Sequence, residues 1–177
     1  MDKSKFTNMP ITEIVNHLSN EFHVPLQKLI EKIADAIIWF SEKYRKEYPK
    51  IVYLKELYNQ FRSEVAKHIE KEDEIMFPMV IDYENNKLNF SEKNKQKIDS
   101  VDFHKMEGEH SIFQNYLDTV IDLLGTCKIN DKNSEECNEV RQDFIDINED
   151  LQEHVYLEEV YIYKTWQEIE RKANEDK

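Results

Sequence analysis

Glycine and proline are scarce, with two and four among 177 residues. Tight β-hairpin turns depend on these residue types, so their scarcity disfavours a protein built from many short strands. No apolar run approaches the ~20 residues that a membrane-spanning helix needs, and the first residues lack the apolar segment of a signal peptide. We therefore expect a cytoplasmic protein that does not associate with membranes.

Cysteine is also rare: the chain has only Cys127 and Cys137, on either side of a polar stretch. Without a secretion signal, reduced thiols are the expected state, and a reversible disulfide that closes this short loop is the alternative. Both cysteines fall away from the histidine positions described below. We do not expect either of them to bind metal there.

Positive charge is outnumbered, because 24 Lys and Arg face 37 Asp and Glu and give a net charge of −13 at pH 7. Binding to nucleic acids or anionic membranes needs clustered Lys and Arg, so this balance argues against both functions. The length suits one domain with ample residues to bury a core.

Histidines replace apolar residues on the inner faces of four predicted helices. Apolar residues recur at steps of three and four in each, which marks one face of a helix. One His lies on each of these faces, and on two of them a Glu follows one turn later. The histidines are His23, His68, His110 and His154, and the glutamates are Glu72 and Glu158. Buried His and Glu are costly unless they are paired or bound to a metal, so the pattern predicts a metal site.

The four histidines are separated by 45, 42 and 44 residues, each about one long helix plus a connection. In an all-α, up-down-up-down four-helix bundle, equal spacing returns each His to a similar height. We expect this bundle over residues 10–172, with flexible tails at 1–9 and 173–177. Its helices should cover roughly residues 10–48, 51–83, 100–125 and 134–172.

Residues that bend, cap or end helices refine these boundaries. Pro25 should bend the first helix, because its ring nitrogen cannot donate a hydrogen bond. The polar residues 84–94 should form the longest connection. Ser100 is the expected N-cap of the third helix, Gly125 its end, and Ser134 the cap of the fourth.

Four imidazoles and two carboxylates exceed the ligands of a closed zinc site. They suit two ions, with each His bound to one ion and the carboxylates bridging both. Iron fits this ligand set best, followed by manganese or zinc. A ferritin-like site would need Glu-x-x-His on two helices, and only Glu107-x-x-His110 has that spacing.

Two further glutamates lie near predicted ligands: Glu64 one turn before the second-helix His, and Glu109 directly before the third-helix His. They are candidates for orienting the histidines or for lining an ion path, and the alternative is a solvated acidic surface. His17 and His104 fall off the faces that carry the other histidines. We expect a surface or capping role for His17 and a solvent-facing position for His104.

These residues resemble the hemerythrin-like (HHE cation-binding) family, in particular its bacterial di-iron branch that repairs iron–sulfur clusters. The segment His68-Ile-Glu-Lys-Glu-Asp-Glu-Ile-Met-Phe-Pro-Met79 is similar to H-x-x-K-E-E-x-I-L-F-P-M of that branch. Further matches are Glu107-Gly-Glu-His110 with E-x-E-H, Phe22-His23 with Y-H, and His154-x-x-x-Glu158 with H-x-x-L-E. The resemblance spans residues 10 to about 165 and implies a left-handed four-helix bundle around a non-haem di-iron centre.

The resemblance separates this chain from oxygen-carrying hemerythrins at two positions. Those proteins have a second His where this chain has Gln114, and an Asp five residues after the last His, where this chain has Glu158 at four. One histidine fewer suggests an open coordination position and a redox-active site.

The chain also departs from the repair branch. The sequence starts close to the expected bundle, and we expect a chain without the N-terminal cysteine domain that those proteins carry. The fourth-helix ending E-N-N-x-L-F-P reads Glu158-Glu-Val-Tyr-Ile-Tyr-Lys164.

By resemblance, the function would be repair of iron–sulfur clusters damaged by nitrosative or oxidative stress, through iron donation and redox chemistry with NO or peroxide. Its cofactors would be two iron ions, bridged by carboxylates and, when ferric, by an oxo group. Its partners would be damaged or apo iron–sulfur proteins. The alternatives are a module that binds or senses O2 or NO, or stores iron, without turnover, and a helical scaffold with incidental histidines. Catalytic residues and the choice between monomer and dimer stay open.

Overall fold

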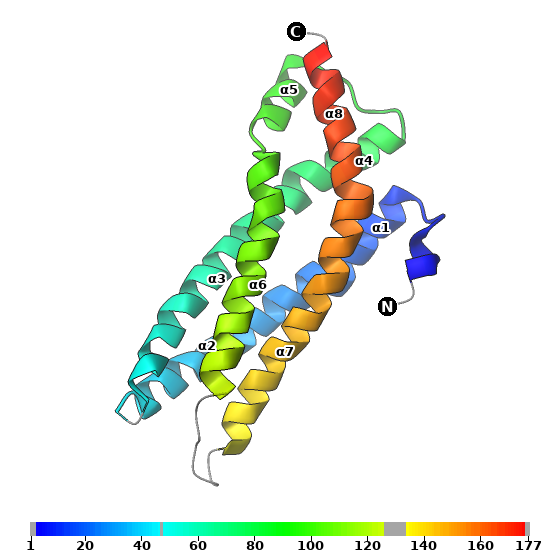
Figure 1. Ribbon diagram of the computed structural model, residues 1–177. Coiled ribbons are helices and arrows are strands. Elements are labelled where there is room, and N and C mark those ends of the chain that lie inside the picture. Colours follow the sequence, from blue (N-terminus) through cyan, green and yellow to red (C-terminus); the bar gives the residue numbers. More distant parts are fainter. Residues whose placement is uncertain (1–2, 47, 126–133, 176–177) are drawn as a thin grey trace.

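The computed structural model describes residues 3–46, 48–125 and 134–175. Within these ranges the regular structure is helical, and four long helices form the expected up-down-up-down bundle (Figure 1). None of the helices in these ranges is long and apolar enough to cross a lipid bilayer.

Three of the four long helices contain a π-helical turn. The first consists of α1 (Ile11–His17), the π turn η2 (Leu18–His23) and α2 (Val24–Tyr44). The second consists of α3 (Val52–Lys71), η4 (Glu72–Met76) and α4 (Phe77–Glu84), and the fourth of α7 (Ser134–Leu157), η5 (Glu158–Ile162) and α8 (Tyr163–Glu175). The third is the uninterrupted α6 (Phe103–Gly125). Three short helices, η1 (Lys3–Phe6), η3 (Pro49–Ile51) and α5 (Glu92–Asp99), complete the described elements.

Two of the π turns precede a proline. Pro25 and Pro78 lie in the first turns of α2 and α4, directly after η2 and η4. A proline has no N–H to close an α-helical turn, so a wider turn before it loses no further hydrogen bond. At Pro25, where a bend is expected, the helix therefore widens and continues.

Helix packing gives the bundle a closed ring of neighbours: α2 contacts α3 and α7, and α6 contacts the same two helices. Its core consists of two apolar clusters. On every long helix a buried polar residue lies between the last residue of one cluster and the first of the other: His23 between Phe22 and Ile30, Glu72 between Ile69 and Met76, His110 between Met106 and Phe113, and His154 between Leu151 and Leu157. The bundle thus has a polar layer at mid-height.

Two expectations about the segment before α6 are wrong. Residues 92–99 form α5, a helix that is absent from the predicted set. Ser100 ends α5, and its Oγ donates to the carbonyl of Lys97 at 2.6 Å. Asp102 caps α6 instead, because its Oδ1 accepts from the backbone N–H of Lys105 at 3.1 Å.

Within the segments expected as flexible tails, 1–9 and 173–177, some of the described residues pack on the bundle, and the flexibility of these segments stays a prediction. Phe6 is 1% exposed and packs in the apolar cluster that contains Phe22, Met76 and Trp166. The helix α8 continues to Glu175, with Ala173 buried. Phe6 is the one large aromatic residue in the first ten positions, and burying it fixes this segment against the bundle. Cys137 is buried, with its Sγ 3.8 Å from the carbonyl of Leu124, and Cys127 lies outside the described residues, so the reduced state expected for the two thiols stays a prediction.

Candidate metal centre

The six predicted ligands converge in the polar layer, and none of them is more than 6% exposed. They form two groups of four that could hold a metal ion: His23, Glu72, His154 and Glu158, and His68, Glu72, His110 and Glu158. Within each group the candidate ligand atoms lie within 4.8 Å of one another. Both glutamates belong to both groups.

The histidines of the first group come from η2 and α7. The Nε2 atoms of His23 and His154 are 3.1 Å apart. His23 Nε2 lies 3.5 Å from Glu72 Oε2 and 3.7 Å from Glu158 Oε1, and His154 Nε2 contacts the same Glu158 oxygen.

The second group lies between α3 and α6 and uses the other oxygen of each carboxylate. The Nε2 atoms of His68 and His110 are 3.0 Å apart. Glu72 Oε1 lies 3.4 Å from His68 Nε2, and Glu158 Oε2 lies 3.0 Å from His110 Nε2. Each carboxylate thus faces both groups, with one oxygen toward each.

The candidate ligand atoms are better placed to coordinate cations than to form hydrogen bonds with one another. At most one of two facing Nε2 atoms can carry a proton toward the other, so each pair presents at least one lone pair. Glu72 Oε2 is buried without a hydrogen-bond partner. Buried, unsatisfied acceptors are costly, and a cation at the first group would satisfy this one. Imidazole with carboxylate is a ligand set that suits iron, manganese or zinc.

Two acidic residues accept hydrogen bonds from Nδ1, the outer ring nitrogen, of two of the four histidines. Asp73 Oδ1 accepts from His23 Nδ1 at 2.9 Å and from Ser19 Oγ at 3.1 Å. Glu109 Oε2 accepts from His68 Nδ1 at 2.8 Å. A carboxylate can only accept, so each bond places a proton on Nδ1 and turns Nε2 toward the other ligands.

The surrounding carboxylates raise the pKa of two of these histidines. Burial lowers the pKa of His23, but Asp73, Glu158 and Glu72 outweigh it and raise the pKa to about 10. Burial is likewise outweighed at His68, where Glu72 and then Glu109 raise the pKa to about 10. Without a cation both rings are protonated at pH 7. A bound cation would replace those protons.

The structure also places Glu64, His104 and His17. Glu64 pairs with Lys67 at 2.9 Å, with its side chain 39% exposed, so a role in an ion path stays a prediction. His104 is exposed, as expected. His17 is half-buried between the rings of Phe6 and Phe22, so its expected surface position is wrong. The signal for this packing is Phe6, an aromatic residue within the expected tail.

Tyr163 is a residue of the centre that sequence reasoning missed. Its O–H donates to Glu72 Oε1 at 3.1 Å and lies 3.3 Å from His110 Nε2, and its ring stacks on His110 at an interplanar angle of 3°. Burial and the nearby carboxylates raise the pKa of Tyr163 above its ordinary value, so it stays protonated. In a regular α-helix, Tyr161 or Ile162 would share the face of Glu158. The π turn η5 adds a residue and brings Tyr163 there.

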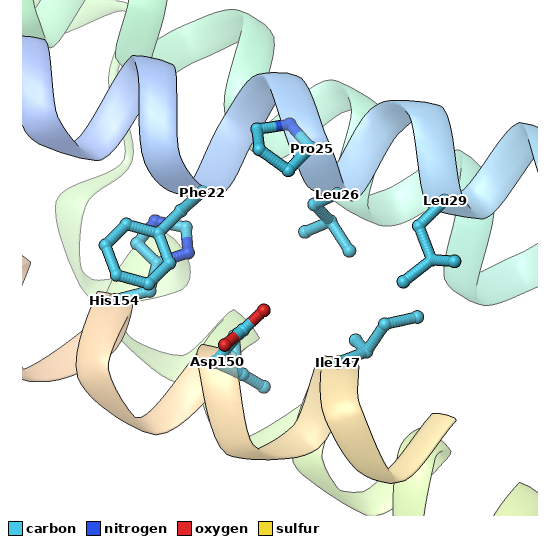
Figure 2. Close-up of a pocket in the computed structure, with 8 residues that line it drawn as sticks. Phe22, Pro25, Leu26, Leu29, Ile147, Asp150 and His154 are labelled. Atoms are coloured by element: carbon cyan, nitrogen blue, oxygen red, sulfur yellow. The ribbon is translucent and has the colours of Figure 1, made fainter. Parts of the chain in front are cut away.

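Small apolar cavities adjoin the centre. One of about 50 Å³ lies between α2 and α7 and reaches His154, and the Asp150 carboxylate points into it (Figure 2). A second, of about 20 Å³, touches His68, His110 and His154 and is otherwise lined by apolar side chains. An open polar groove between α6 and α7 reaches His110 from outside.

Comparison with known proteins gives one family match and two curated relatives. The family described as Hemerythrin HHE cation binding domain matches residues 15–166. Proteins named iron-sulfur cluster repair protein ScdA, from two strains of Staphylococcus epidermidis, are each 24% identical over 166 residues, covering 90% of this chain and 67% of theirs. No solved structure gives a significant match.

Proposed function

Because the chain belongs to the hemerythrin HHE cation-binding family, we propose that its polar layer holds two iron ions. His23 and His154 would bind one ion, and His68 and His110 the other. Glu72 and Glu158 would span both, since each directs one oxygen to each group. Bound iron would supply one-electron redox chemistry and an affinity for small ligands.

The protein's own residues would set the conditions for that chemistry. Asp73 and Glu109 would keep the Nε2 lone pairs of His23 and His68 directed at the ions. The apolar clusters above and below the polar layer would exclude water from it. Glu72 and Glu158 would neutralise part of the charge of both ions, so the ions would be held as a pair.

We infer that the function is repair of iron–sulfur clusters by iron donation, coupled to redox chemistry with NO or peroxide. The observation that supports donation is the ligand count: each ion would have two histidines and two shared carboxylate oxygens, fewer than the six ligands of an octahedral ion. An incompletely coordinated ion can pass to an acceptor through a mixed complex. The two relatives named as repair proteins point the same way. The acceptors would be damaged or apo iron–sulfur proteins.

Iron transfer to a purified apo iron–sulfur protein tests this function. The iron-loaded chain is mixed with an apo-ferredoxin, sulfide and a thiol without oxygen, and cluster formation is followed by visible absorption. We expect clusters to form at the expense of the chain's iron. His104→Ala should match wild type, because His104 is exposed and belongs to neither ligand group, whereas His68→Ala should donate less iron. If all iron stays on the chain, the donation function is wrong.

The apolar cavities favour a second candidate, namely binding of O2 or NO without turnover. Neutral diatomic molecules enter small apolar cavities, and two such cavities touch histidines of the centre. A reversible change in absorption on adding and removing the gas, with two irons retained throughout, would favour this candidate over donation.

A further inference from the structure

The two proposed metal positions match each other in nearly every contact. Each has two histidines and one oxygen from each bridging glutamate. At each, one ring is held by an acidic residue: His23 by Asp73, and His68 by Glu109. A difference between the positions must therefore come from another residue.

Tyr163 supplies such a difference, because its contacts belong to one position. Its O–H donates to Glu72 Oε1, the oxygen that faces His68, and its oxygen lies 3.3 Å from His110 Nε2. Glu72 Oε2, which faces His23, has no hydrogen-bond partner. The phenol is 2% exposed and its ring is stacked on His110, so the contact is held in place.

A hydrogen bond to one carboxylate oxygen draws electron density away from the lone pairs that would bind a cation. Glu72 would then be a weaker ligand through Oε1 than through Oε2.

We propose that Tyr163 makes the two metal positions unequal, so that the ion held by His68 and His110 is bound more weakly and leaves first. This inference rests on the proposed two-ion centre and names the ion that would be donated. Tyr163 acts as a positioning residue through Glu72 and is not itself a ligand. Tyr163→Phe keeps the ring and removes only the hydrogen bond.

Release of metal to a chelator tests the proposal without any assay of activity. The full chain is loaded with two Fe(II), or with Zn(II) as a redox-inert probe, and release is followed by the colour of the chelator complex. Wild type should release one ion quickly and one slowly. In Tyr163→Phe the fast phase should slow by roughly tenfold, the range expected for losing one hydrogen bond to a charged group, while the slow phase stays unchanged.

Single-position variants assign the two phases. His23→Ala should retain the ion at His68 and His110, and His68→Ala the ion at His23 and His154. The ion left in His23→Ala should leave faster than the ion left in His68→Ala. Adding Tyr163→Phe should slow release only in the His23→Ala background. This comparison between single variants tests the order of release even if Tyr163→Phe folds poorly.

The opposite order of release, or identical release by Tyr163→Phe and wild type, would overturn the inference. A visible charge-transfer band in the ferric protein that is lost in Tyr163→Phe would also overturn it, because the phenol oxygen would then be a ligand. If the chain binds two ions but gives any of these results, this inference is wrong and the proposed function still stands. A chain that does not bind two ions loses the proposed function itself.

Discussion

Asp73 Oδ1 lies 2.9 Å from Nδ1 of His23, on the side of the ring opposite the Nε2 atom that faces Glu72 and Glu158. The two residues come from different long helices, in η2 and η4, so the bond also joins the π turns of those helices. The Asp73 carboxylate fixes which nitrogen of the His23 ring is free to bind metal.

Removing the charge of Asp73 should therefore weaken metal binding without removing a ligand. Asp73→Asn keeps the size of the side chain, but an amide can present an N–H to His23 and favour the wrong ring tautomer. We expect a loss of metal affinity of about 10- to 100-fold, measured by competition with a chelator. Glu74→Gln alters the exposed neighbouring carboxylate and should leave the affinity unchanged. Equal effects of the two substitutions would contradict the role of Asp73.

The bridging role of the glutamates predicts a joint loss of both ions. Glu72→Gln or Glu158→Gln keeps the side-chain volume but removes the charge that would span the pair, so occupancy of both positions should fall together. His23→Ala should mainly remove one ion. Metal per chain, together with the absorption of the ferric protein, distinguishes these outcomes. Glu64→Gln, at a residue paired with Lys67, should retain two ions. Two ions and a normal spectrum in Glu72→Gln and Glu158→Gln would place these carboxylates outside the bridge.

Metal removal should lower thermal stability, because the buried carboxylates and imidazoles would lose their cations. At metal concentrations ~100-fold above Kd, each bound ion contributes about 2.7 kcal/mol, which corresponds to roughly 5–10 °C in Tm per ion. Scanning calorimetry before chelation, after it and after adding Fe(II) measures this shift. His68→Ala should reduce the response, because it would leave only the ion at His23 and His154, while exposed His104→Ala should preserve the full response. A chelator that leaves Tm unchanged would argue for a scaffold with incidental histidines.

Stability of the metal-free protein should fall as pH rises above about 6.5. The pKa values of His23 and His68 are raised to about 10 in the folded chain, against 6.5 for an ordinary His. The folded state therefore holds protons that the unfolded state releases, and the stabilisation is complete below pH 6.5 and lost as pH rises toward 10. The slope should reach up to about 1.4 kcal/mol per pH unit for each ring. Urea unfolding at pH 6.5, 8 and 9 measures it.

The metal-loaded protein is the matched control for this pH series. Its bound imidazoles would already be neutral, so the same rise in pH should not release protons from them. A metal-free protein whose stability rises with pH over this range would show that the carboxylates do not hold the two rings protonated.

Much of this arrangement follows from local periodicity, which the sequence carries by itself. Residues four apart lie on one helix face, so the helical period alone assigns His68 with Glu72 and His154 with Glu158 to the interior. The even spacing of the four histidines predicted one layer in a four-helix bundle, and the structure brings the six side chains together in such a layer. That they bind metal stays a prediction.

Tertiary structure decided which histidines face each other. His23 meets His154 because η2 packs on α7, and His68 meets His110 because α3 packs on α6. Sequence spacing fixes the height of each side chain along its helix but not which helices become neighbours. Tyr163 and Asp73 escaped prediction for a related reason: each lies in or just after a π turn, where one added residue shifts the helix face that a regular period would give. The contacts that bring Asp73 to His23 and Tyr163 to Glu72 cross the bundle, so they exist only once the four helices have assembled.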